Sequence, residues 1–127
     1  MALLKIYTMP ENKSFLREEL GYKIKLIFSA ALNCTEIPTS PSNIELVYSE
    51  GVDLADIDFI IEIVACARPS IQDISDSIIT NLNNIYPDKL FSVYFNLIQE
   101  EGMANSPRAS KSDRPITMGE ALELAKR

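Results

Sequence analysis

The sequence predicts an α+β fold in which two strand–helix–strand units form a four-stranded sheet with two helices on one face. Two segments with apolar residues at helical spacing are each flanked by short apolar strands. The same order of elements occurs twice, and a helix that joins two strands of one sheet favours a right-handed crossover. At 127 residues, the chain is large enough to bury a single hydrophobic core.

The first unit begins with a short strand at residues 2–9 and continues into a helix from about 13 to 33. Gly21 lies inside this helix and weakens it. Asn33 is a candidate for a left-handed stop. A loop rich in Pro, Ser and Thr then leads to a second strand at residues 43–48. The helix is predicted from an apolar stripe formed by Leu16, Leu20, Ile24, Ile27 and Ala31.

The second unit runs from a strand at residues 58–67 to a strand at residues 90–98. Between them, Ser70 is expected to cap a helix, with Asp73 at the third position to support the cap. The sequence Tyr86-Pro87-Asp88 stops this helix. Its apolar stripe consists of Ile71, Ile74, Ile78, Leu82 and Ile85.

The two strands of the second unit are apolar in both alternating sets of side chains, although helices can cover only one set. The uncovered set would form a larger apolar patch than a monomer usually exposes. We therefore expect an oligomer in which sheets pack together, and coverage by the C-terminal tail is the alternative. On the strand at residues 58–67 the two sets are Phe59, Ile61, Ile63 and Ala65 against Ile60, Val64 and Cys66, and on the strand at residues 90–98 they are Phe91, Val93, Phe95 and Leu97 against Leu90, Tyr94 and Ile98.

The domain is expected to span residues 1–103, and residues 104–127 to form a flexible tail. Residues 104–116 are small, polar and proline-containing, which is typical of a linker. Thr117-Met118-Gly119-Glu120 has the pattern of a capping box and predicts a short terminal helix. Such a short helix is marginal alone, so it either docks on its own domain or a neighbour, or frays.

Composition excludes several classes of function. The chain has no histidine, and its two cysteines, Cys34 and Cys66, are far apart in the sequence. Triad chemistry that depends on histidine and thiolate-rich metal sites are therefore excluded, and we expect no metal and no cofactor. The formal net charge of −6 disfavours binding to nucleic acid. The sequence has neither a membrane span nor a secretory signal, which predicts a cytoplasmic protein.

Two charges in the apolar segment FIIEIVACARP need an explanation, Glu62 and Arg68. A guanidinium at the end of a strand can bind a carboxylate through two parallel hydrogen bonds. The two residues are about 20 Å apart along an extended strand, so they cannot pair directly within one chain. Ion pairing with a neighbouring subunit is the alternative to ligand binding. Lys5 is the only charged residue on the first strand. It either binds a ligand or lies at the rim of the sheet without a binding role.

The layout resembles that of the tautomerase superfamily, which includes 4-oxalocrotonate tautomerase and macrophage migration inhibitory factor. The resemblance covers about residues 1–103. It rests on the repeated strand–helix–strand order and on two segments, Ile61-Glu62-Ile63 with Arg68-Pro69-Ser70-Ile71-Gln72-Asp73, and Asp88-Lys89-Leu90-Phe91-Ser92-Val93-Tyr94-Phe95. The first segment is similar to a bacterial branch without assigned activity. The resemblance implies a homotrimer.

The resemblance also implies an N-terminal catalytic amine, which in this family belongs to a proline exposed by removal of the initiator Met. This chain has Ala2 there, and removal of Met1 would leave a primary amine with a pKa of roughly 7.7–8.0 before any perturbation. Desolvation can lower that pKa and supply a neutral base or an imine-forming nucleophile. Glu45 stands where the family places a substrate-binding Arg, so recognition of an acidic substrate is left to Arg68 or Lys5.

These observations predict a tautomerase-like protein with weak keto–enol tautomerisation of a small carbonyl acid, using the Ala2 amine. The alternative is a non-catalytic oligomeric module of ferredoxin-like type that binds a ligand or regulates a partner. A third hypothesis is a scaffold protein whose terminal helix binds a partner. Strand pairing separates the first two, because the tautomerase arrangement pairs the first and second strands in parallel.

Overall fold

The computed structural model describes residues 2–49, 54, 56–99 and 113–127. Four strands form one mixed sheet in the order β2-β1-β3-β4. β1 is parallel to β2, β3 is parallel to β4, and β1 is antiparallel to β3. The predicted α+β class is confirmed, and the parallel pairing of β1 with β2 is the one that the resemblance implies. The strands are β1 (Ala2–Thr8), β2 (Ile44–Ser49), β3 (Phe59–Cys66) and β4 (Phe91–Ile98).

The first helix is continuous but changes its hydrogen-bond pattern along its length. It follows the 3-10 turn η1 (Pro10–Asn12) and consists of α1 (Lys13–Phe15), the π-helical turn η2 (Leu16–Leu20) and α2 (Gly21–Leu32). Gly21 closes the π turn, because its N–H donates to the carbonyl of Leu16. A second 3-10 turn, η3 (Pro41–Asn43), precedes β2, and α3 (Ile71–Ile85) joins β3 to β4.

Two helix ends differ from the prediction. Asn33 is extended (φ −64°, ψ 130°) rather than left-handed, and its side-chain oxygen accepts a hydrogen bond of 2.8 Å from the backbone N–H of Thr39. Ser70 is left-handed (φ 58°, ψ 46°) and its side chain makes no capping hydrogen bond. A side-chain cap requires an extended backbone at this position, which Ser70 lacks. The Ser70 carbonyl still accepts from the N–H of Ile74 at 3.0 Å.

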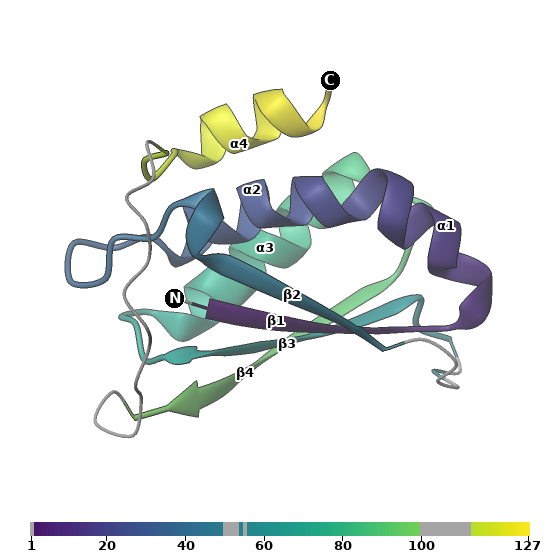
Figure 1. Ribbon diagram of the computed structural model, residues 1–127, viewed down its shortest axis with the longest axis horizontal. Coiled ribbons are helices and arrows are strands. Elements are labelled where there is room, and N and C mark those ends of the chain that lie inside the picture. Colours follow the sequence, from purple (N-terminus) through teal and green to yellow (C-terminus); the bar gives the residue numbers. More distant parts are fainter. Residues whose placement is uncertain (1, 50–53, 55, 100–112) are drawn as a thin grey trace.

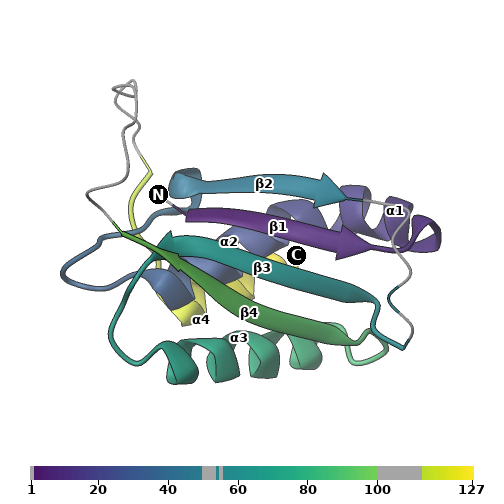
Figure 2. The ribbon, with the colours of Figure 1, turned by 90° about the horizontal axis from the view of Figure 1, so that it is seen from below.

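Helices α2 and α3 cover one face of the sheet, and Figure 2 shows the strands in front of them with the opposite face uncovered. Along β1, buried side chains alternate with partly exposed ones, as the pleat requires, and β3 follows the same alternation except at Glu62, which is also buried. The buried set faces the helices and forms the core. The largest fully buried side chains of the core come from the strands and the helices together, and they are Phe28, Phe59, Leu4, Ile6, Leu16, Leu20, Ile24, Ile27, Leu32, Ile44, Ile61 and Ile63.

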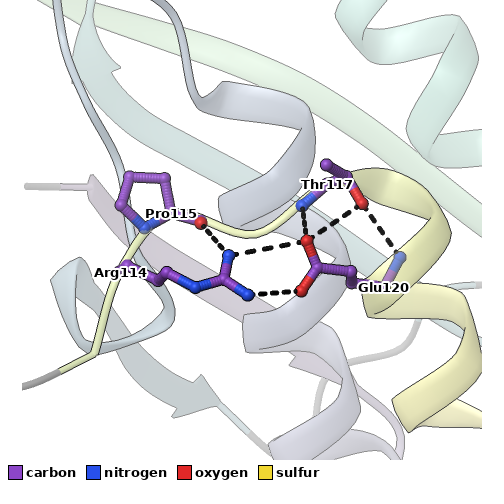
Figure 3. A network of polar contacts seen from close by, with 4 residues as sticks. All are labelled: Arg114, Pro115, Thr117 and Glu120. Atoms are coloured by element: carbon purple, nitrogen blue, oxygen red, sulfur yellow. Dashed lines mark hydrogen bonds and ion pairs between the residues drawn. The ribbon is translucent and has the colours of Figure 1, made fainter.

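The predicted terminal helix is α4 (Met118–Ala125), and the predicted capping box is present. Thr117 Oγ1 accepts from the N–H of Glu120 at 3.1 Å, and the Glu120 carboxylate accepts from the Thr117 N–H at 3.3 Å. Arg114 donates to the same carboxylate at 2.8 Å, which with the capping bonds holds the pKa of Glu120 below its usual value (Figure 3). These bonds fix the entry to the helix.

Helix α4 packs on α2 as a third layer, on the side of the helices away from the sheet (Figure 1). Ala121 and Ala125 are buried in this contact. Asp113 adds a second attachment, because its carboxylate accepts from the N–H and hydroxyl of Ser42 at 2.8 and 2.6 Å. The described part of the tail therefore does not cover the sheet face opposite the helices, which is the open face of the sheet. Most of the predicted linker, residues 104–112, lies outside the described residues.

Both cysteines are free thiols. None of the helices in the described part of the chain is long and apolar enough to cross a membrane.

Candidate functional site

The N-terminal end of β1 brings together two of the three predicted site residues. Ala2 is the first residue of this central strand, is only 1% exposed and belongs to the hydrophobic core. It lies opposite Ile44 of β2. Because β3 runs antiparallel to β1, the last residue of β3 lies at the same end, and Arg68 follows two residues later. Figure 2 shows the start of β1 and the end of β3 at the same end of the sheet.

Arg68 is 5% exposed, and its guanidinium donates to three uncharged acceptors. Nε donates to the carbonyl of Leu32 at 3.0 Å, and Nη1 donates to the carbonyl of Cys66 at 2.8 Å. Nη2 donates to the hydroxyl of Thr39 at 3.3 Å. Leu32 is the last residue of α2, where the helix dipole favours a cation. Arg68 thus ties β3 to the end of α2 and to the loop that follows it.

A guanidinium has five N–H donors, and these contacts use three of them. Burial lowers the pKa of Arg68, although nearby Cys34 and Cys66 act in the opposite direction. A cation buried among neutral acceptors is a favourable partner for a carboxylate, because the cost of its desolvation has already been met.

Glu62 lies on the open face of the sheet, and side chains of the same chain bind its carboxylate. Its carboxylate accepts from the Tyr7 hydroxyl at 3.1 Å and from the Asn96 side-chain amide at 2.9 Å. The Asn96 hydrogen bond is the main reason that the pKa of Glu62 is below its usual value, with Tyr7, Lys5 and Tyr94 adding to the effect. Glu62 is only 8% exposed, and these hydrogen bonds satisfy the buried acid without a neighbouring subunit. Glu62, Tyr7, Asn96 and Lys5 form a polar cluster on this face.

Lys5, the third predicted site residue, belongs to this cluster rather than to the Ala2 end. It lies opposite Glu62 on β3 and Val47 on β2. Side chains alternate along a strand, so the Lys5 side chain lies on the face opposite that of Ala2. The structure therefore brings Ala2 and Arg68 to one end of the sheet and leaves Lys5 on the open face.

A cavity of about 400 Å³ lies between the first helix and the edge strand β2, and it was not predicted from the sequence. A signal for it was present, because a glycine lies in mid-helix with a basic residue four positions to either side. Neither Ala2 nor Arg68 lines this cavity, which is formed by Arg17, Gly21, Tyr22, Lys25, Glu45, Leu46 and Tyr48. In the described residues, no group of three or more His, Cys, Asp or Glu side chains could hold a metal ion.

No family model and no curated protein matches the chain. Among solved structures, the chain is similar to a domain of unknown function (DUF1904) from Sebaldella termitidis, with 19% identity and a TM-score of 0.51 over 83% of this chain and 95% of that one. A macrophage migration inhibitory factor-like protein from Entamoeba histolytica is similar at 12% identity and a TM-score of 0.45, over 83% of this chain and 93% of that one. The first of these two similarities shows a shared fold.

Proposed function

We propose that this chain is a tautomerase-like protein that catalyses slow keto–enol tautomerisation of a small carbonyl acid. The base is the α-amine of Ala2 after removal of Met1, and Arg68 holds the substrate carboxylate. The observation that carries the proposal is the position of Ala2, at the end of a central strand and 1% exposed, with a buried guanidinium at the same end of the sheet.

The chemistry requires a neutral amine near pH 7. Ala2 belongs to the apolar core, and apolar surroundings disfavour an ammonium ion, so we propose that the amine is largely neutral near pH 7. The neutral amine takes a proton from the carbon beside the carbonyl, and the electron pair left on carbon forms the enolate. The resulting ammonium returns a proton to the enolate oxygen, which completes the enol and restores the base.

The substrate carboxylate is proposed to bind the two N–H groups of Arg68 that the intramolecular contacts leave over. The same contacts fix the guanidinium in place, so little side-chain entropy is lost on binding. Glu45 and Lys5 have no role in this site.

We further propose that the protein is a homotrimer assembled through the open sheet face. Apolar side chains surround the polar cluster on this face, and the described tail leaves it uncovered. Val47 of β2 is 47% exposed there. Val47→Lys is expected to yield a particle of the single-chain mass of 14.2 kDa in sedimentation, whereas wild type gives about three times that mass. Leu97→Lys is the matched control, because Leu97 is 46% exposed but alternates onto the helix side of β4.

Enolisation of phenylpyruvate, followed by ultraviolet absorbance, tests the catalytic proposal. We expect slow turnover that disappears when the α-amine is blocked by acetylation, with the sedimentation of the protein unchanged. Turnover that survives the block, or the absence of turnover in the unmodified protein with Met1 removed, contradicts the proposal. The absence of turnover would leave a non-catalytic binding module as the better description.

A further inference from the structure

The cavity beside β2 combines an unusual backbone with a defined charge pattern, and both point to a ligand. Its helix wall contains the π turn Leu16–Leu20, which Gly21 closes by donating to the Leu16 carbonyl. Single π turns within α-helices are rare and occur frequently at functional sites. The extra residue in the turn changes which side chains the helix presents to β2.

Gly21 is required by the close approach of Tyr48 from the strand. A Cβ atom at position 21 would lie 2.8 Å from the Tyr48 hydroxyl oxygen and 3.2 Å from the Leu16 carbonyl oxygen. The glycine therefore provides the space into which the phenol of Tyr48 extends. Any side chain at this position would displace the hydroxyl from the cavity wall.

The polar groups of the cavity are mostly donors. Arg17 and Lys25 come from the helix, and Glu45 comes from the strand, which leaves one net positive charge at neutral pH. Burial raises the pKa of Tyr48 although nearby Arg17 lowers it, so the phenol is protonated and can donate. Tyr22, with 68% of its surface exposed, offers a ring at the mouth.

We propose that this cavity binds a small carboxylic acid that also carries a hydroxyl group on a planar skeleton. The carboxylate accepts hydrogen bonds from Arg17, Lys25 and the Tyr48 hydroxyl, the ligand hydroxyl donates to Glu45, and the ring packs on Tyr22. The volume of about 400 Å³ falls within the range of small-molecule sites. This site is separate from Ala2 and Arg68 and goes beyond the proposed function.

The test is a titration of the full chain with 4-hydroxybenzoate, followed by amide chemical shifts. Shift changes are expected along the helix at residues 17–25 and along the strand at residues 45–48. The methyl ester of the same compound keeps the ring and hydroxyl but lacks the charge, and it should bind at least tenfold more weakly. Equal binding of the ester, or shift changes confined to other regions, would overturn the proposal, as would the absence of saturable binding.

The double variant Arg17→Met with Lys25→Met should weaken binding by roughly ten- to a hundredfold, because charge-assisted hydrogen bonds are lost. Lys23→Met removes a cation from the same helix outside the cavity, where Lys23 pairs with Glu19, and should leave affinity unchanged. Equal weakening in both would indicate only general electrostatic attraction and would sink the proposal. Gly21→Ala keeps every charge and favours helix, yet it should weaken binding by displacing Tyr48. Phenylpyruvate enolisation should be unchanged in all three proteins.

Discussion

Replacing Arg68 with Met measures how strongly the fold depends on this buried cation. Methionine keeps an apolar stem of similar length but donates no hydrogen bond. The carbonyl of Leu32 then loses its donor at 3.0 Å, and an unpaired buried acceptor costs about 1–3 kcal/mol. The carbonyl of Cys66 loses a donor at 2.8 Å in a partly buried position, where the cost is smaller. The third bond, to the Thr39 hydroxyl, is long at 3.3 Å and contributes less. Removing a buried charge offsets part of this loss.

We therefore expect Arg68→Met to lower the free energy of unfolding by about 2–3 kcal/mol. With a urea m-value of about 1–3 kcal/mol/M for a domain of this size, the midpoint should fall by about 0.7–3 M. Arg127→Met is the control, because the Arg127 side chain is 72% exposed and its ion pair with Glu123 is 3.8 Å long. Its effect should stay within about 0.5 kcal/mol. Equal midpoints for the two variants would refute the role assigned to Arg68.

Three further predictions concern other parts of the chain. The pKa of Glu62 is lowered in the folded state, mainly by the hydrogen bond from Asn96. The ionised Glu62 therefore stabilises the fold fully above its unfolded pKa of about 4.3, and this stabilisation is lost as the pH falls through the lower folded pKa. Glu62→Gln should thus lower the urea midpoint at pH 7, and the difference from wild type should shrink as the pH falls below the unfolded value of about 4.3. It should vanish once Glu62 is protonated in the folded state, and a difference that stays constant would contradict this. Thr117→Ala removes the cap on Glu120 and should cost about 1 kcal/mol, with faster amide exchange confined to α4. Ala2→Pro supplies a secondary amine at the first residue of a strand, where proline is tolerated, and should raise the phenylpyruvate rate; an unchanged rate would argue against the amine as base.

The elements of the fold could be predicted because local patterns determine them. The second helix was predicted from apolar residues spaced 3, 4, 4 and 3 apart, and the structure has it at Ile71–Ile85. The capping box at Thr117 was also predicted correctly, since it depends only on residues three positions apart. Ser70 has the same kind of sequence signal but a left-handed backbone, which the residue types alone do not determine.

The candidate sites were harder to predict because their parts come from distant segments. The prediction that Arg68 lies at the end of a strand was confirmed, but its acceptors include two backbone carbonyls that leave no mark in the sequence. The acid of the apolar strand, Glu62, is satisfied by side chains of β1 and β4 that register alone brings together. The helix wall of the cavity at β2 contains the π turn Leu16–Leu20, which periodicity does not resolve.

The pKa of the Ala2 α-amine is the most direct measure of whether burial prepares this group as a base. It can be obtained by NMR titration after mass spectrometry has shown that Met1 is absent. We expect a value clearly below the usual range of about 7.7–8.0, so that the amine is largely neutral at pH 7. A value within or above that range would contradict the proposed role of Ala2.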